Sequence, residues 1–266
     1  MFELFSEIFT GQAIIFFIGC VRLMVFFFMV PFLSGEAVPP QLRFSLSVLL
    51  ALFVYPTFAG LQPPESAELF FPWLIAVLGK ELLIGFLLAY TAGVIFWAML
   101  SVGFIIDNQR GAGMAQATDP ASGEPTSLFG GFLHQATIYI LFSSGAFLQM
   151  LLLLLSSYAA CPPGFELSAE ARGTIPAYLL GQFSRLMIMT ILFAAPIMLV
   201  CLLTDVSLGI VNRISPQLNV FFLSMPIKSA LALFMIMLYM GILLPLIGRE
   251  LFSYGGHLES LWNVLR

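Results

Sequence analysis

The sequence predicts an all-α membrane protein built from long apolar helices. Of its 266 residues, 60% are hydrophobic and 9% are charged, whereas soluble domains carry about 25% charged residues. Apolar segments recur along the whole chain, and most reach the roughly 20 residues that a helix needs to cross a bilayer core of about 30 Å. Because lipid offers no hydrogen-bond partners to exposed backbone groups, we expect these segments to be helical.

Each apolar segment is bounded by a break rich in proline, glycine or polar residues. Residues 12–33 form the first segment and residues 42–59 the second, with the break SGEAVPPQ between them. The third segment, residues 69–106, follows the break QPPES and is much longer than a bilayer requires. No domain-sized linker is visible, so a single domain over residues 1–266 is expected.

In the second half of the chain, apolar segments again alternate with proline-rich or polar breaks. Residues 128–158 form a fourth segment, which ends at the proline-rich break CPPGFELSAEARG. Residues 177–211 and 220–247 form the last two segments, and the polar break NRISPQ separates them. We therefore predict a helix over every one of these segments.

Charged residues inside the apolar segments argue against helices that face only lipid. Arg22, Lys80, Glu81, Asp205 and Lys228 all lie within such segments. A charge at the bilayer centre costs about 2.5–3.5 kcal/mol on insertion scales, so such groups usually face protein or water. Snorkelling near helix ends is an alternative for Lys80 and Arg22. Taken together with the prolines that interrupt these segments, the charges favour helices buried against other protein.

Small residues recur every fourth position in the third segment, at Gly85, Ala89 and Gly93. Such a stripe lets two helix backbones approach closely. It is typical of helix packing within one chain and also of a subunit contact, and we favour packing within the chain.

Composition and motifs also bear on the other functional classes. The net charge is −4, which provides no basic surface for nucleic acid. Cys20, Cys161 and Cys201 are far apart, and neither His134 nor His257 has a neighbour at ligand spacing. No nucleophile or nucleotide-binding motif is recognisable. We therefore expect no catalytic residue, no metal, no cofactor and no nucleic-acid partner.

One polar stretch, IIDNQRGAGMAQATDPASGEP at 105–125, stands between two long apolar segments. Gly111 and Gly113 free its backbone to depart from a helix. At membrane depth, such a segment persists only where protein buries it or where it lines a water-filled cavity. A plug or gate is one interpretation, and an ordinary exposed loop is the other. Asp107 and Arg110 are placed to form a local ion pair.

Two sequence blocks, IIDNQRGAGMAQATDPAS and LGIVNRISPQLNVFFLSMPIK, resemble the T subunit of the type III secretion export apparatus. Its flagellar counterpart is the R subunit of the export gate. FFFMVPFLSGEAVP and GKELLIGFLLA agree as well, so the resemblance covers essentially the whole chain. The sequence IDNQRG resembles the injectisome members of the family more than the flagellar members.

The resemblance implies a place in a large assembly at the bacterial inner membrane, within the secretion basal body. One copy of this chain would join five R-type and four S-type subunits in a helical export gate, much of it lifted out of the bilayer. Further partners would be the U-type switch subunit, the large V-type export-gate protein, inner rod or needle components and lipid. Unfolded secreted proteins would be the substrate.

The resemblance also implies roles for particular residues. Residues 1 to about 175 would correspond to the R-type fold, and residues from about 176 to 266 to the S-type helical hairpin. The hairpin turn and its subunit contacts would involve Asn212, Arg213, Pro216, Gln217, Pro226 and Lys228. A pore plug over residues 107–123 would comprise Asp107, Asn108, Gln109, Arg110, Gly111, Gly113, Met114, Gln116, Asp119 and Pro120.

Two other functions compete with a gating subunit as interpretations of the sequence. A secondary transporter would use the polar stretch as a broken helix that holds a small substrate, and it would show paired interruptions in two similar halves. A membrane-embedded hydrolase would need a nucleophile and a base, which the sequence does not reveal. The prediction is therefore a non-enzymatic gating subunit, with the transporter as the alternative.

Overall fold

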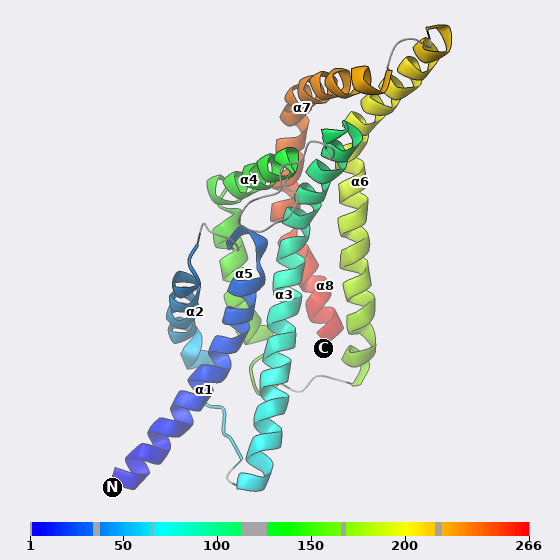
Figure 1. Cartoon of the computed structure of the whole chain (residues 1–266). Coiled ribbons are helices and arrows are strands. Elements are labelled where there is room, and N and C mark those ends of the chain that lie inside the picture. Colours follow the sequence, from blue (N-terminus) through cyan, green and yellow to red (C-terminus); the bar gives the residue numbers. More distant parts are fainter. Residues whose placement is uncertain are drawn as a thin grey trace. The chain divides into compact units, whose positions relative to one another are not determined.

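The structure is a computed structural model that describes residues 2–33, 38–64, 66–112, 127–165, 169–215 and 220–265. Every regular element in these ranges is helical, which confirms the predicted all-α class (Figure 1). Four helices of the described chain are long and apolar enough to cross a membrane, or five if α4 and α5 count as one span. The helices are α1 Phe2–Met29, α2 Pro40–Val54, α3 Ala67–Gln109, α4 Leu128–Ser143, α5 Ala146–Ala160, α6 Ala169–Ile214, α7 Val220–Phe252 and α8 Tyr254–Leu265.

The chain divides into two compact units, each assembled from separate stretches of sequence. Unit 1 comprises Met1–Gly93, Phe147–Gln182 and Ser253–Arg266, and unit 2 comprises Val94–Ala146 and Phe183–Phe252. Long helices such as α3 therefore contribute to both units. The division into an R-type and an S-type part follows other boundaries and stays a prediction.

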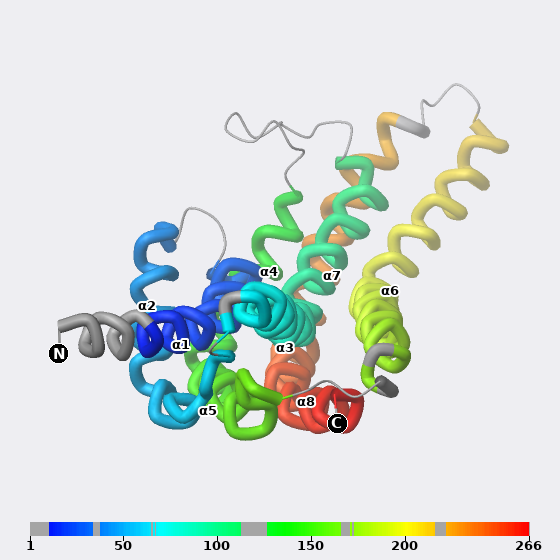
Figure 2. The backbone as a smooth tube through the Cα atoms, turned by 90° about the horizontal axis from the view of Figure 1, so that it is seen from below, coloured from blue at the N-terminus to red at the C-terminus, as the bar shows by residue number. Residues whose placement is uncertain are grey.

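In unit 1, α1 and α2 lie side by side (Figures 1 and 2). Helix α2 turns its small and polar side toward the protein, with Arg43, Ser47 and Ala51 buried. Its large residues point outward, as Leu49 and Phe53 illustrate. An outward apolar face of this kind suits lipid or another apolar protein rather than water.

Helix α8 has the opposite pattern and was not predicted as a separate element. Tyr254, Leu258, Leu261 and Leu265 are buried at helical spacing along one side. On the other side Glu259 is exposed. The spacing of the leucines was visible in the sequence, but the last predicted segment ends at residue 247, and no element was assigned to the residues of α8.

The prediction of one continuous segment over residues 128–158 is wrong. Helix α4 ends at Ser143 and α5 begins at Ala146. Between them Gly145 has φ +78°, a backbone conformation that residues with a Cβ rarely adopt. The glycine therefore ends the first helix inside an apolar run.

Candidate functional site

The polar stretch begins where α3 meets α4 in unit 2, and the two helix backbones touch there. A Cβ built on Gly103 of α3 would lie 2.0 Å from the backbone N of Gly130 in α4. No side chain fits at that distance, so glycine is required at the crossing. This contact fixes the end of α3 against the first turn of α4.

Asp107, in the last turns of α3, joins the two helices through its buried carboxylate. Its Oδ2 accepts hydrogen bonds from Ser127 Oγ at 2.5 Å and from the Phe129 backbone N at 3.2 Å. Its Oδ1 accepts from Arg110 Nε at 2.8 Å and lies 2.7 Å from Arg110 Nη2. The ion pair expected between Asp107 and Arg110 is thus confirmed, and the carboxylate has two further donors that the sequence did not reveal.

Ser127 and Phe129 complete this cluster from the α4 side. Ser127 is the N-cap of α4, where its Oγ accepts from Gly130 N at 2.8 Å. The Arg110 guanidinium carbon lies 4.8 Å from the centre of the Phe129 ring, within cation–π range. We call Asp107, Arg110, Ser127 and Phe129 the α3–α4 junction. It holds together the two points at which residues 113–126 leave and rejoin the described chain.

Gly111 ends α3 immediately beyond the junction. Its φ is +83°, and its N donates to Asn108 O at 3.1 Å, which closes the last turn. Asp107, Asn108 and Gln109 therefore belong to the helix, and the expectation of an irregular backbone is wrong for these three. The remaining predicted plug residues, Gly113, Met114, Gln116, Asp119 and Pro120, lie outside the described residues.

The hairpin residues are also partly helical. Asn212 and Arg213 lie in the last turn of α6, so their placement in the turn is wrong. Pro216 and Gln217 lie outside the described residues, and Pro226 lies inside α7. Lys228 Nζ is 2.9 Å from Asp205 Oδ1, so these two charged residues, which lie inside apolar segments, pair within the chain.

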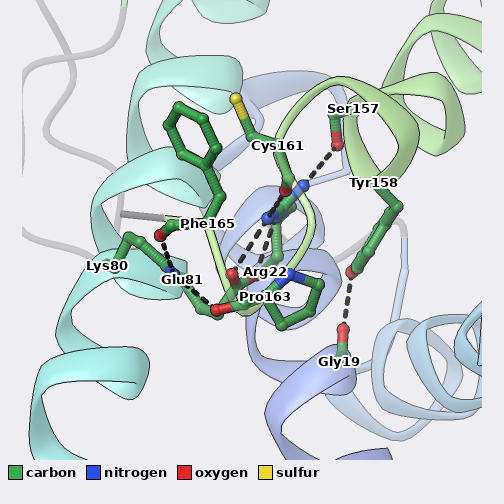
Figure 3. A network of polar contacts seen from close by, with 9 residues as sticks. All are labelled: Gly19, Arg22, Lys80, Glu81, Ser157, Tyr158, Cys161, Pro163 and Phe165. Carbon is green, nitrogen blue, oxygen red and sulfur yellow. Dashed lines mark hydrogen bonds and ion pairs between the residues drawn. The ribbon is translucent and has the colours of Figure 1, made fainter. Parts of the chain in front are cut away.

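A second polar cluster lies in unit 1 around Arg22 of α1 (Figure 3). Arg22 Nε and Nη2 donate to Glu81 Oε2 at 2.8 Å and Oε1 at 2.9 Å, a two-pronged pair between α1 and α3. Both side chains have 0% exposure. Nη1 donates to Ser157 Oγ at 3.0 Å and Nη2 to Cys161 O at 2.7 Å. The predicted burial of Arg22 is confirmed, and snorkelling is wrong for this residue.

Aromatic and backbone groups surround this ion pair. The Arg22 guanidinium carbon lies 4.3 Å from the centre of the Tyr158 ring, and Tyr158 Oη donates to Gly19 O at 2.5 Å. Lys80 Nζ donates to the carbonyls of Pro163 and Phe165 in the turn after α5 (Figure 3). Lys80 therefore binds protein rather than reaching toward a lipid headgroup.

The small-residue stripe of α3 packs within the chain. A Cβ on Gly85 already lies 2.8 Å from Arg22 O and 3.0 Å from Val25 Cβ of a neighbouring helix. Ala89 and Gly93 are buried as well. The interpretation as helix packing inside the chain is confirmed for Gly85, and it explains how Glu81 comes within reach of Arg22 one turn away.

The sequence reasoning missed several of these residues. Ser127 carried a usable signal, because a serine immediately before an apolar helical run is a common N-cap. Gly103 and Gly130 lie outside the recognised stripe, and neither has another glycine or alanine four residues before or after it. Ser157 and Tyr158 gave no signal, since only the folded chain brings residues about 135 positions apart together.

Comparison with known proteins shows similarity over most of the chain. The family model described as "Bacterial export proteins, family 1" matches residues 13–253. The Yop proteins translocation protein T of Yersinia pestis is 38% identical over 219 residues, 82% of each chain. The surface presentation of antigens protein SpaR of Salmonella typhimurium is 32% identical, over 86% of this chain and 83% of its own. The flagellar biosynthetic protein FliR of Bacillus subtilis is 26% identical over 92% of each chain.

Proposed function

This chain belongs to family 1 of the bacterial export proteins, with the T subunits of type III secretion and the flagellar FliR proteins, and we propose that it is a gating subunit. As a member of that family it is a membrane-embedded subunit of a protein export apparatus. In our proposal it forms part of the inner-membrane entry pore for unfolded proteins. Of the polar stretch at 107–123, the part that follows α3 closes this pore at rest.

The α3–α4 junction is the observation that carries the proposal. Asp107 is only 1% exposed, yet its carboxylate binds donors from both flanks of the polar segment. Charge-assisted hydrogen bonds of this kind are about twice as strong as neutral ones. Residues 113–126 therefore start and finish on one fixed base, which suits a closing loop better than a linker between two free helices.

The outward surface of α6 supports a place within a larger assembly. Large apolar residues are exposed from Phe183 to Ile214 in unit 2. At 1.5 Å per residue this stretch of helix is about 47 Å long, whereas the hydrocarbon core is about 30 Å thick. Lipid alone therefore leaves part of the apolar surface uncovered, and apolar helices of neighbouring subunits are the partners that fit it.

We assign these partners to the R-type and S-type subunits, in a gate with five and four copies of them and one copy of this chain. The U-type switch subunit, the V-type export-gate protein, rod or needle components and lipid complete the proposed surroundings. In such a gate the polar residues would meet water in the conduit, where their hydrogen bonds can be satisfied.

Deletion of residues 111–118 tests the closing role. In the assembled complex, the deletion is expected to raise ion leakage across the inner membrane while the other subunits still co-purify. A control variant replaces residues 113–118 with the same number of Gly and Ser residues. It keeps the length of the segment and changes its side chains, so it separates the effect of length from that of side-chain chemistry. Unchanged conductance in a correctly assembled deletion complex would refute the proposal.

A further inference from the structure

We propose that Met225 of α7 is a positioning residue that holds the end of α3, so that movement of the α6–α7 hairpin reaches the α3–α4 junction. The importance of this contact for closing the pore depends on the function proposed above. The contact itself does not, because it rests on the packing of three helices within unit 2.

The contact is close, and a larger residue at position 111 would require the Met225 side chain to shift. A Cβ built on Gly111 would lie 3.3 Å from Met225 Cγ and 3.7 Å from its Cε. Gly111 is also the residue with φ +83° that ends α3. Met225 therefore covers the helix end at a point where the backbone conformation favours glycine and where an added Cβ would press on the Met225 side chain.

The same face of α7 is tied to α6. Lys228 follows Met225 by three positions, and residues at that spacing share a helix face. Its Nζ lies 2.9 Å from Asp205 Oδ1 of α6, and the Lys228 side chain is 12% exposed. One face of the first turns of α7 thus contacts α3 through Met225 and α6 through Lys228.

Pro226 lies between these two contacts, inside α7. Proline removes a backbone hydrogen bond and is a common site of helix bending. A second proline, Pro245, lies farther along α7, and a bend at Pro226 would let the first turns of the helix move as a piece. A shift of these turns displaces Met225 and therefore Gly111. Arg110 directly precedes Gly111, and its guanidinium binds the Asp107 carboxylate, so the shift reaches the α3–α4 junction.

Hydrogen exchange in the purified, assembled complex tests the positioning role. Met225→Ala is expected to speed exchange of the Gly111 amide, which donates to Asn108 O, roughly fivefold or more. Met225→Leu keeps the apolar volume and is expected to leave the rate unchanged. Met237→Ala is the matched control, because Met237 lies on the same helix and is 76% exposed.

The reciprocal variant keeps the test decisive if Met225→Ala does not assemble. Gly111→Ala pushes a methyl group toward Met225 and is expected to speed exchange over residues 222–228, since coupling between two sites acts in both directions. Equal exchange in the Met225→Ala and Met237→Ala complexes, or no response of residues 222–228 to Gly111→Ala, would overturn the inference.

Ion leakage then separates this inference from the proposed function. If Met225→Ala raises both Gly111 exchange and leakage, the positioning role and its link to closure are supported. If exchange responds but deletion of residues 111–118 causes no leakage, the gating function is refuted while the contact stands. If the deletion leaks but exchange does not respond, the function stands and the inference fails.

Discussion

Glu81→Leu is expected to destabilise the protein more than Arg22→Met, although each variant breaks the same ion pair. A carboxyl group left alone in the interior can be neutralised by a proton. A guanidinium cannot lose its charge at any pH at which proteins fold. The variant that leaves Arg22 without Glu81 therefore retains a buried, uncompensated charge.

The magnitude follows from the burial and the remaining partners. Both side chains are fully buried, with 0% exposure, and removal of one member of such a pair costs about 3–5 kcal/mol of unfolding free energy. In Glu81→Leu the guanidinium keeps only the neutral acceptors Ser157 Oγ and Cys161 O and the face of Tyr158. We therefore place Glu81→Leu at the upper end of this range.

The double variant Arg22→Met, Glu81→Leu supplies the sharper comparison. It removes both charges and fills the space with apolar groups, which is often close to neutral. The hydrogen bonds to Ser157 Oγ and Cys161 O and the contact with the Tyr158 ring are then lost, at about 1–3 kcal/mol for each polar group left without another partner. The double variant is thus expected to be more stable than Glu81→Leu alone, so the two substitutions are strongly non-additive.

Thermal unfolding of the purified complex, with the amount of assembled complex as a second measure, ranks these variants. Glu259→Leu is the matched control, because the same substitution is made at an exposed position of α8. We expect unfolding temperatures in the order wild type and Glu259→Leu, then the double variant, then Arg22→Met, then Glu81→Leu. A Glu81→Leu complex as stable as wild type would refute the reasoning, as would a double variant no better than that single variant.

Two further predictions concern tight packing and the hydroxyl of Tyr158. Gly103→Ala is expected to cost about 1–3 kcal/mol or more, because its Cβ would lie 2.0 Å from Gly130 N, whereas Gly131→Ala meets open space and is expected to be neutral or stabilising. Equal unfolding temperatures for these two variants would contradict the Gly103 contact. Tyr158→Phe removes the hydrogen bond to Gly19 O but keeps the ring, so a loss of about 0.5–1.5 kcal/mol is expected in denaturant unfolding, and no loss would exclude that bond.

The apolar pattern was enough to predict the long helices, because the backbone N–H and C=O groups of an apolar run in lipid must form their hydrogen bonds within the protein. It failed where a single residue overrides the pattern, as Gly145 does between α4 and α5. It also failed at helix ends. Asp107 and Asn212 were predicted to lie outside helices from their polarity, yet each completes a last turn.

The side-chain contacts were harder to predict than the helices. The charges of Arg22 and Glu81 indicated burial against protein, but their pairing depends on helix contacts between positions 59 residues apart. Asp107 and Arg110 were predicted to pair because they have opposite charges and lie three residues apart in the polar stretch. Ser127, 20 residues from Asp107, could have been proposed as an N-cap, but not as its partner.

The position of residues 113–123 in the assembled complex tests the central claim most directly. An electron cryomicroscopy map of the complex at rest would locate this segment relative to the axis of the export channel. We predict density for it across the axis, extending from a base formed by Asp107 and Ser127. Density at the outer rim of the complex, with an open axial channel beside it, would contradict the proposed closing role.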